Sequence, residues 1–221
     1  MRSALVLVAF ASLSYASTPS ARDVPLAKLY TACKNPGHVA LTFDDGPWTN
    51  NKKISDMVSN AGGNCTFFMN GNNWDCIYNS YNGTNYTAVI QYAIAAGHQI
   101  ASHSWSHKDL TTCDNVTMGQ ELDWMNTALK KVAGVIPAFI RPPYGAYNDD
   151  VLKACGARNM SVVTWDSDSE DSWANANASN SKAAYDRQIR ASQGSMMILN
   201  HETVDFTWYD FLMLDLGISS T

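Results

Sequence analysis

A chain of 221 residues can hold one large domain or two small ones, and its 46% hydrophobic and 16% charged residues describe a folded core, not a disordered segment. The formal net charge of −5 argues against nucleic acid as a partner, because a polyanion needs a basic surface. The composition is therefore that of an ordinary globular protein, and only the sequence motifs indicate its function.

The N-terminus has the pattern of a secretory signal. Arg2 precedes the short apolar run ALVLVAFASLSYA, and Ser14-Tyr15-Ala16 fits the small-residue cleavage pattern. This run is too short for a membrane-spanning helix, and we expect no other transmembrane segment. We expect a signal peptide over residues 1–16, a lead-in over 17–35 and one domain over 36–221. The protein would be secreted or associated with a cell wall, as a monomer.

Strand-like and helical segments alternate along the domain. Apolar, β-branched runs predict strands over 38–43, 65–71, 99–103, 138–145, 160–166 and 195–201. Helical spacing predicts helices over 51–62, 86–98, 116–135, 149–158 and 181–192. This alternation indicates parallel strands with right-handed crossovers, in a barrel or an open sheet. Polar residues follow the apolar runs, as on the catalytic face of α/β barrels, so a barrel-like α/β domain is favoured.

The segment VALTFDDGP, residues 39–47, ends in two adjacent carboxylates that would repel each other and raise each other's pKa. His103 and His107 lie four residues apart after another strand, so they share a face if this segment is helical. An isolated pair of this kind usually lies on the surface, but a strand-end pair in a chain with five histidines favours a metal site. Two imidazoles and one carboxylate leave positions open for water and substrate, as in catalytic zinc sites. The metal would stabilise one of Asp44 and Asp45 as the anion, and the other could act as a base on water.

Two further strand ends carry ionisable groups. Arg141 precedes Pro142-Pro143 and can orient a carboxylate through paired hydrogen bonds, or it is a surface charge at a turn. His201 ends an apolar strand and is either structural or a general acid for a leaving amine.

Five motifs occur in order, and together they carry a family resemblance. They are TFDDGP at 42–47, HSWSH at 103–107, RPPYG at 141–145, DSEDSW at 168–173 and LNH at 199–201. From about residue 36 to residue 201 the chain resembles the polysaccharide deacetylases of the NodB-homology type, carbohydrate esterase family four. It looks most like the fungal chitin deacetylases. The resemblance implies a distorted (β/α) barrel with fewer than eight complete units.

The resemblance also implies a role for each matching residue. Asp44 is implied to be the catalytic base, held by Arg141. The implied ligands of one divalent metal ion, Zn²⁺ with Co²⁺ or Ni²⁺ as substitutes, are Asp45, His103 and His107. The backbone N–H of Tyr144 would contribute to an oxyanion hole.

The resemblance implies that His201 protonates the leaving amine. An acid of the fourth motif would orient His201 and tune its pKa. Asp171 is our choice for that acid, although Asp166 and Asp168 compete. The acetyl methyl group would lie against Leu199 and one of two tryptophans, Trp165 or Trp173. The family pattern Asp-x-x-Asp-Trp is broken here, because Ser172 separates Asp171 from Trp173.

Cysteine and sequon patterns add expectations about processing. Secretion favours disulfides among Cys33, Cys65, Cys76, Cys113 and Cys155. Cys65 and Cys76 could close a small loop. The family usually continues well beyond its last histidine, so we expect a truncated C-terminus that leaves Cys33 unpaired. Sequons suggest a glycoprotein, with Asn64 and Asn159 as poor candidates and these better ones: Asn82, Asn85, Asn115 and Asn177.

The resemblance implies hydrolysis of N-acetyl groups from N-acetylglucosamine units of chitin or its oligomers. Acetyl xylan and peptidoglycan remain open as substrates, since deacetylases of those polymers share the motifs. An inactive secreted carbohydrate-binding relative is a further alternative. A non-haem iron oxygenase shares the ligand set of two histidines and a carboxylate, but that reading leaves Asp44, Arg141 and His201 without a role.

Overall fold

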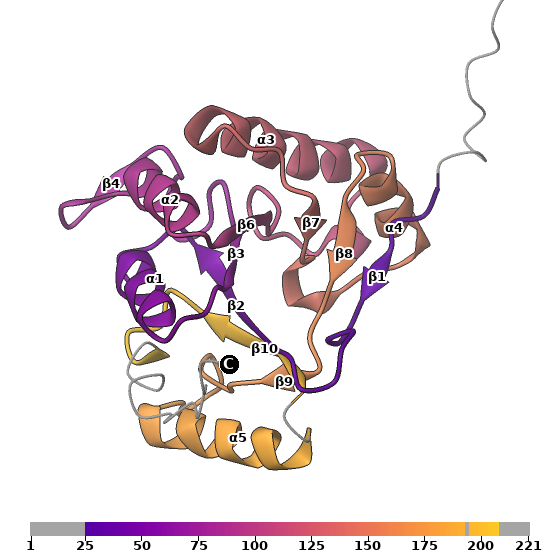
Figure 1. Ribbon diagram of the computed structural model, residues 1–221. Coiled ribbons are helices and arrows are strands. Elements are labelled where there is room, and N and C mark those ends of the chain that lie inside the picture. Colours follow the sequence, from indigo (N-terminus) through magenta and orange to yellow (C-terminus); the bar gives the residue numbers. More distant parts are fainter. Residues whose placement is uncertain (1–24, 193–194, 208–221) are drawn as a thin grey trace, which may run out of the picture.

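Eight strands form one curled parallel sheet with helices on its outside, in a computed structural model that describes residues 25–192 and 195–207 (Figure 1). The strands are β1 (Leu29–Tyr30), β2 (Val39–Gly46), β3 (Thr66–Met69), β6 (Gln99–Ser102), β7 (Phe139–Ile140), β8 (Ser161–Val163), β9 (Ser167–Asp168) and β10 (Met196–His201). Their order is β1-β8-β7-β6-β3-β2-β10-β9, and every pairing between neighbours is parallel. Among the described residues β1 and β9 do not pair, so the barrel is incomplete, which confirms the predicted fold class.

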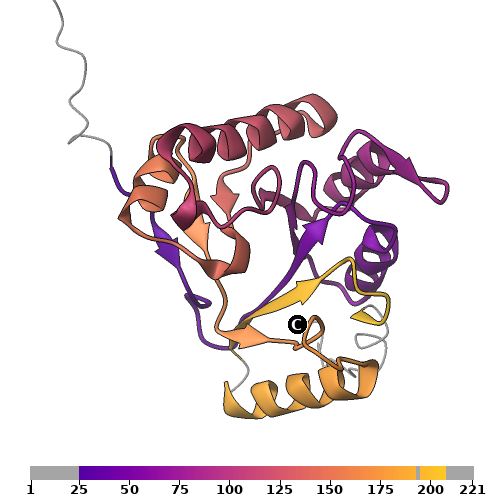
Figure 2. The same ribbon diagram turned by 180° about the vertical axis from the view of Figure 1, so that it is seen from behind.

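Within the described residues there are five α-helices, and both views show them around the outside of the sheet (Figures 1 and 2). They are α1 (Asn51–Asn60), α2 (Tyr86–Ala95), α3 (Asn115–Ala133), α4 (Asp149–Gly156) and α5 (Ala178–Ala191). Four of them begin at an Asn or Asp whose side chain accepts a hydrogen bond from the first turn, namely Asn85, Asp114, Asn148 and Asn177. Such a cap satisfies a backbone N–H group that has no partner within the helix.

Successive side chains of β2 point alternately to the core outside the sheet and to the barrel interior. Phe43 points outward into the main core, which lies between the sheet and α1, α2, α3 and α5. Thr42 and Asp44 point the other way, because successive side chains of a strand face opposite sides. Both of them bind Arg141, so the interior at this level is polar. A second core packs under α3 and α4.

Short elements account for most differences from the sequence prediction. The apolar run at 138–145 yields only the two residues of β7, because Pro143–Gly145 forms a 3-10 turn, η2. Helix α5 begins three residues earlier than predicted, at the Asn177 cap. Strands β1 and β9, the hairpin of β4 (Ser80–Tyr81) and β5 (Thr84–Asn85), and the 3-10 turn η1 (Leu110–Thr112) were not predicted. These elements have two or three residues each, too few for a periodic pattern.

The expected disulfides are absent, and all five cysteines carry free thiols. Cys65 is buried with its Sγ 3.6 Å from His98 Nδ1, so it packs into the main core and not toward Cys76. Cys155 is buried in the second core. Cys33, expected to be unpaired, donates from its Sγ to the Met196 carbonyl at 3.2 Å.

Two sequence expectations lie outside the described residues. They are the signal peptide over 1–16 and the carboxyl-terminal end of the domain beyond residue 207. Within the described part, no helix combines the length and the apolar character that crossing a membrane requires.

Candidate active site

The end of β2 presents two neighbouring aspartates to one place. The register between β2 and β3 shifts between Phe43 and Gly46, and Asp45 has a left-handed φ of 73°. A regular strand would point adjacent side chains to opposite faces. Here Asp44 Oδ2 and Asp45 Oδ1 lie 3.6 and 3.7 Å from the same atom, His103 Nε2. The bulge is therefore what lets both carboxylates face the site.

His103 and His107 meet through a loop and not through a helix. The segment after β6 is irregular, and Ser104 and His107 have left-handed φ values of 66° and 57°. The two imidazole rings nevertheless lie 4.9 Å apart between centroids. The helical condition considered from the sequence is not met, while the expected proximity of the two rings is observed. The tight turns of the loop replace the helical spacing.

His103 is held in one orientation. Its Nδ1 lies 2.7 Å from the Arg141 carbonyl oxygen, which can only accept, so Nδ1 carries the proton. This leaves the Nε2 lone pair directed at the aspartates. Burial lowers the pKa of His103 to about 3, so the ring is neutral. A neutral imidazole fixed by a hydrogen bond from its other nitrogen is typical of metal-ligating histidine.

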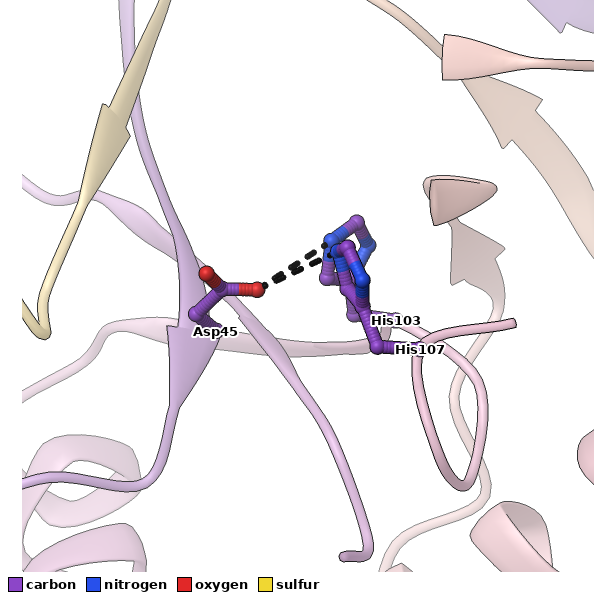
Figure 3. A group of neighbouring side chains, drawn as sticks. All are labelled: Asp45, His103 and His107. Carbon is purple, nitrogen blue, oxygen red and sulfur yellow. Dashed lines mark ion pairs between the residues drawn. The ribbon is translucent and has the colours of Figure 1, made fainter. Parts of the chain in front are cut away.

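Asp45, His103 and His107 form the group of side chains that could hold a metal ion (Figure 3). One ligand atom from each lies within 4.8 Å of the others. Asp45 Oδ1 is 3.7 Å from His103 Nε2 and 3.4 Å from His107 Nε2. Zinc bond lengths of about 2.0–2.2 Å place tetrahedral ligands about 3.4 Å apart. Both the spacing and the donor types therefore fit a zinc-sized cation.

Arg141 lies inside the barrel, so the surface-turn alternative is wrong. Its side chain has 0% exposure, and Nη1 donates to Asp44 Oδ1 and to Thr42 Oγ1, both at 2.8 Å. Nη2 donates to the Thr164 carbonyl at 2.9 Å. Burial raises the pKa of Asp44 above its ordinary value, while the Arg141 charge opposes this shift. Asp44 is thus a buried carboxylate with a fixed cationic partner.

His201 is paired with Asp171. His201 Nδ1 lies 2.7 Å from Asp171 Oδ1, and the other carboxylate oxygen accepts from the His201 backbone N–H at 2.7 Å. Burial lowers the pKa of His201, but the hydrogen bond and charge of Asp171, together with the charges of Asp44 and Asp45, outweigh it and raise the pKa to about 9. The imidazole is therefore protonated at neutral pH.

The two competing acids are engaged elsewhere. Asp166 Oδ1 accepts from the Met197 backbone N–H, and Asp168 Oδ1 accepts from the Glu170 backbone N–H, both at 2.7 Å. Of the three acids considered from the sequence, only Asp171 forms a hydrogen bond with His201 among the described residues.

The residues expected to contact substrate occupy different surroundings. Tyr144, at a left-handed φ of 61°, is exposed and its ring lies 4.8 Å from that of His107. Trp165 is half-buried, with the Arg141 guanidinium 5.4 Å from its ring centre. Trp173 is 59% exposed in a turn, and Leu199 is buried in β10. Of Trp165 and Trp173, Trp165 is thus the one that lies against Arg141.

Sequence reasoning assigned no role to the loop after β3. Asn73 Nδ2 and Trp74 Nε1 donate to the two oxygens of Asp45, at 3.3 and 3.4 Å. Asn70, at the head of this loop, is buried and donates from Nδ2 to the carbonyls of His103 and Ser104. The polar run NGNNW directly after a strand was the available signal. Glu202, buried behind the β2 turn, was also missed.

An incomplete parallel barrel with ionisable groups at the carboxyl ends of its strands defines the NodB-like class of distorted (β/α) barrels. The chain belongs to the polysaccharide deacetylase family, whose model matches residues 31–163. It is 39% identical to a chitin deacetylase from Pestalotiopsis sp over 149 residues, 67% of this chain and 48% of that protein.

Two further relatives extend the comparison. The chain is 34% identical to a probable peptidoglycan-N-acetylglucosamine deacetylase from Arthroderma benhamiae over 156 residues, 70% of this chain and 34% of that protein. The structure of the chitin deacetylase from Colletotrichum lindemuthianum superposes with a TM-score of 0.77 at 26% identity, covering 86% of this chain and 84% of that one. The chain therefore spans less than half the length of the first two relatives.

Proposed function

We propose that the protein removes N-acetyl groups from N-acetylglucosamine units of chitin or its oligomers, in a reaction that depends on a divalent metal ion and yields chitosan and acetate. The observation that carries this proposal is that three groups of side chains lie together at the carboxyl ends of several strands. The group Asp45, His103 and His107 lies beside the Asp44–Arg141 pair, and His201 is protonated by its pairing with Asp171. Amide hydrolysis needs a base, an acid and an electrophile, and each has a candidate here.

Asp44 is the candidate base. Its carboxylate lies next to the proposed metal ligands, with Oδ2 3.6 Å from His103 Nε2. Arg141 holds the opposite oxygen, so Oδ2 stays directed at the place where water would bind. A zinc ion on Asp45, His103 and His107 would lower the pKa of water and polarise the acetyl carbonyl. Asp44 then takes the proton of the attacking water.

His201 is the candidate acid. The raised pKa keeps a proton on the ring at neutral pH. Asp171 accepts from Nδ1, so Nε2 is the nitrogen that can deliver a proton to the departing amine. Base and acid thus come from neighbouring parallel strands, since His201 in β10 is in register with Asp44 in β2.

Substrate contacts complete the proposal. The backbone N–H of Tyr144 would donate to the developing oxyanion. Leu199 and Trp165 are the proposed neighbours of the acetyl methyl group, and Trp173, exposed in its turn, is the alternative to Trp165. We also propose that the protein is secreted to a cell wall and is glycosylated at Asn82, Asn85, Asn115 or Asn177.

Acetate release tests the proposal. The full chain would be assayed on chitooligosaccharides, acetylated xylan and peptidoglycan fragments, each with and without a chelator. We expect acetate from chitooligosaccharides, loss of activity with chelator and recovery with added zinc. Preferential release from peptidoglycan fragments would move the substrate toward that of the Arthroderma relative. Chelator-resistant release, or none from any polymer, would overturn the proposal.

A further inference from the structure

Glu202 is a fully buried carboxylate that the proposed chemistry does not use. It follows His201 in the chain and has 0% exposure. Its Oε1 accepts from the Trp48 backbone N–H at 2.5 Å, and its Oε2 accepts from Asn51 Nδ2 at 2.9 Å. Within the described residues no cation lies within ion-pair distance of it. Burial raises the pKa of Glu202 to about 8, so the two hydrogen bonds, and not an ion pair, hold this side chain in place.

These contacts tie the end of β10 to the turn that carries Asp45. Besides the two side-chain bonds, the Glu202 backbone N–H donates to the Asp44 carbonyl at 3.1 Å, and Asn50 Nδ2 donates to the Glu202 carbonyl at 3.1 Å. Glu202 therefore forms hydrogen bonds along the whole segment from Asp44 to Asn51.

The carboxylate also fills the space beneath the turn. A Cβ added at Gly46 would lie 2.2 Å from the Glu202 carboxyl carbon, well inside van der Waals contact. A larger residue at Gly46 would therefore have to displace the Glu202 carboxyl group. Gly46 is the direct neighbour of Asp45, so the position of Glu202 limits the path of the backbone right beside Asp45.

Asp45 requires such support. A non-glycine residue at a φ of 73° is strained, and strain of this kind persists only where the surroundings enforce it. Repulsion from Asp44 also acts against the conformation that brings the two carboxylates together. In an extended conformation Asp45 would turn away from His103 and His107.

We propose that Glu202 is a positioning residue that holds the 44–48 turn so that Asp45 faces His103 and His107. This inference rests on the proposed metal site. The same contacts also anchor the residues that lead into α1, which alone would make Glu202 a stabilising residue only. The two roles differ in their effect on metal affinity, because a merely stabilising residue leaves the affinity of the folded protein unchanged.

Calorimetric titration with Zn²⁺ alone separates these roles. Glu202→Gln keeps the side-chain volume but replaces one acceptor oxygen with an NH2 group, whereas Asn51→Ala keeps Glu202 and removes one of its hydrogen-bond partners. We expect both variants to bind zinc 10–100-fold more weakly than the unmodified chain, the range typical of residues that orient ligands. Val132→Ala, a core truncation in α3, is the matched control and should lose thermal stability without changing zinc affinity.

The outcomes are distinguishable. An unmodified chain that binds no zinc overturns the proposed function itself. Zinc bound by the unmodified chain and equally well by both variants overturns the positioning role alone. Weakening in Glu202→Gln but not in Asn51→Ala also overturns it, because losing a hydrogen-bond partner of Glu202 would then leave the metal site unchanged. Should Glu202→Gln fail to fold, Asn51→Ala still decides the question.

Discussion

At the scale of single residues, Asp171 controls the protonation of His201. The pKa of His201 is about 9, against an ordinary value of 6.5, and Asp171 is the largest contribution that raises it. Because the acid must carry its proton, activity should be retained below this pKa and lost as pH rises through it. Asp171→Asn removes the charge and should move the alkaline limb of the kcat profile down by at least about one pH unit. The measurement is acetate release from pH 6 to 10.

Asp166→Asn is the matched control for this prediction. Asp166 is close in sequence but binds the Met197 backbone N–H instead of His201. The alkaline limb of the kcat profile should therefore stay in place in Asp166→Asn. An unchanged limb in Asp171→Asn would remove His201 from the role of general acid.

Sequence reasoning was also most successful for single residues. Asp44, Arg141, Asp171 and His201 were chosen from strand ends and motifs, and the structure pairs them as Asp44–Arg141 and Asp171–His201. Glu202 could not be chosen in this way. Its importance comes from contacts to Trp48 and Asn51, which are more than 150 residues away in the chain.

At the scale of elements, the loop with both histidines packs against the loop after β3. The N–H groups of Gly71 and Asn72 both donate to the Trp105 carbonyl, at 2.9 and 2.7 Å. A Cβ at Gly71 would lie 1.9 Å from the Trp105 ring, so Gly71→Ala must displace Trp105, which lies between His103 and His107 in the chain. We expect a loss of about 1–3 kcal/mol in stability and weaker zinc binding.

Thermal unfolding and zinc titration would check this expectation. Gly63→Ala is the control, because a Cβ there meets its nearest neighbour at 3.6 Å, an ordinary contact. Gly63→Ala should retain zinc affinity. Equal zinc affinity in both variants would show that the packing of Trp105 does not set the histidine geometry.

Element prediction worked where segments were long and periodic. The helix expected at 116–135 is observed as Asn115–Ala133, ending at Gly134 with a left-handed φ of 72°. The four-residue spacing of the histidines suits a helix, but the 103–107 segment is irregular. Left-handed residues at Ser104 and His107 give the same proximity, and a spacing pattern cannot reveal them.

For the whole molecule, the absence of disulfides is a testable property. Burial raises the pKa of both Cys65 and Cys155, that of Cys155 to about 12, so neither forms thiolate readily in the folded state. Alkylation without reductant should leave these two unmodified in native protein. In denaturant it should add five labels, one for each free cysteine. Fewer labels in denaturant, restored by a reductant, would demonstrate a disulfide and contradict the structure.

The central claim is that the two adjacent aspartates have different roles. Acetate release by zinc-loaded Asp44→Asn tests this claim most directly. Asp45 is assigned to the metal with His103 and His107, whereas Asp44 is held by Arg141 for the attacking water. Asp44→Asn should therefore bind zinc with near-normal affinity while kcat falls about 10²–10⁴-fold. Asp45→Asn, the companion variant, should mainly lose zinc affinity. Near-normal acetate release by zinc-loaded Asp44→Asn would contradict the account.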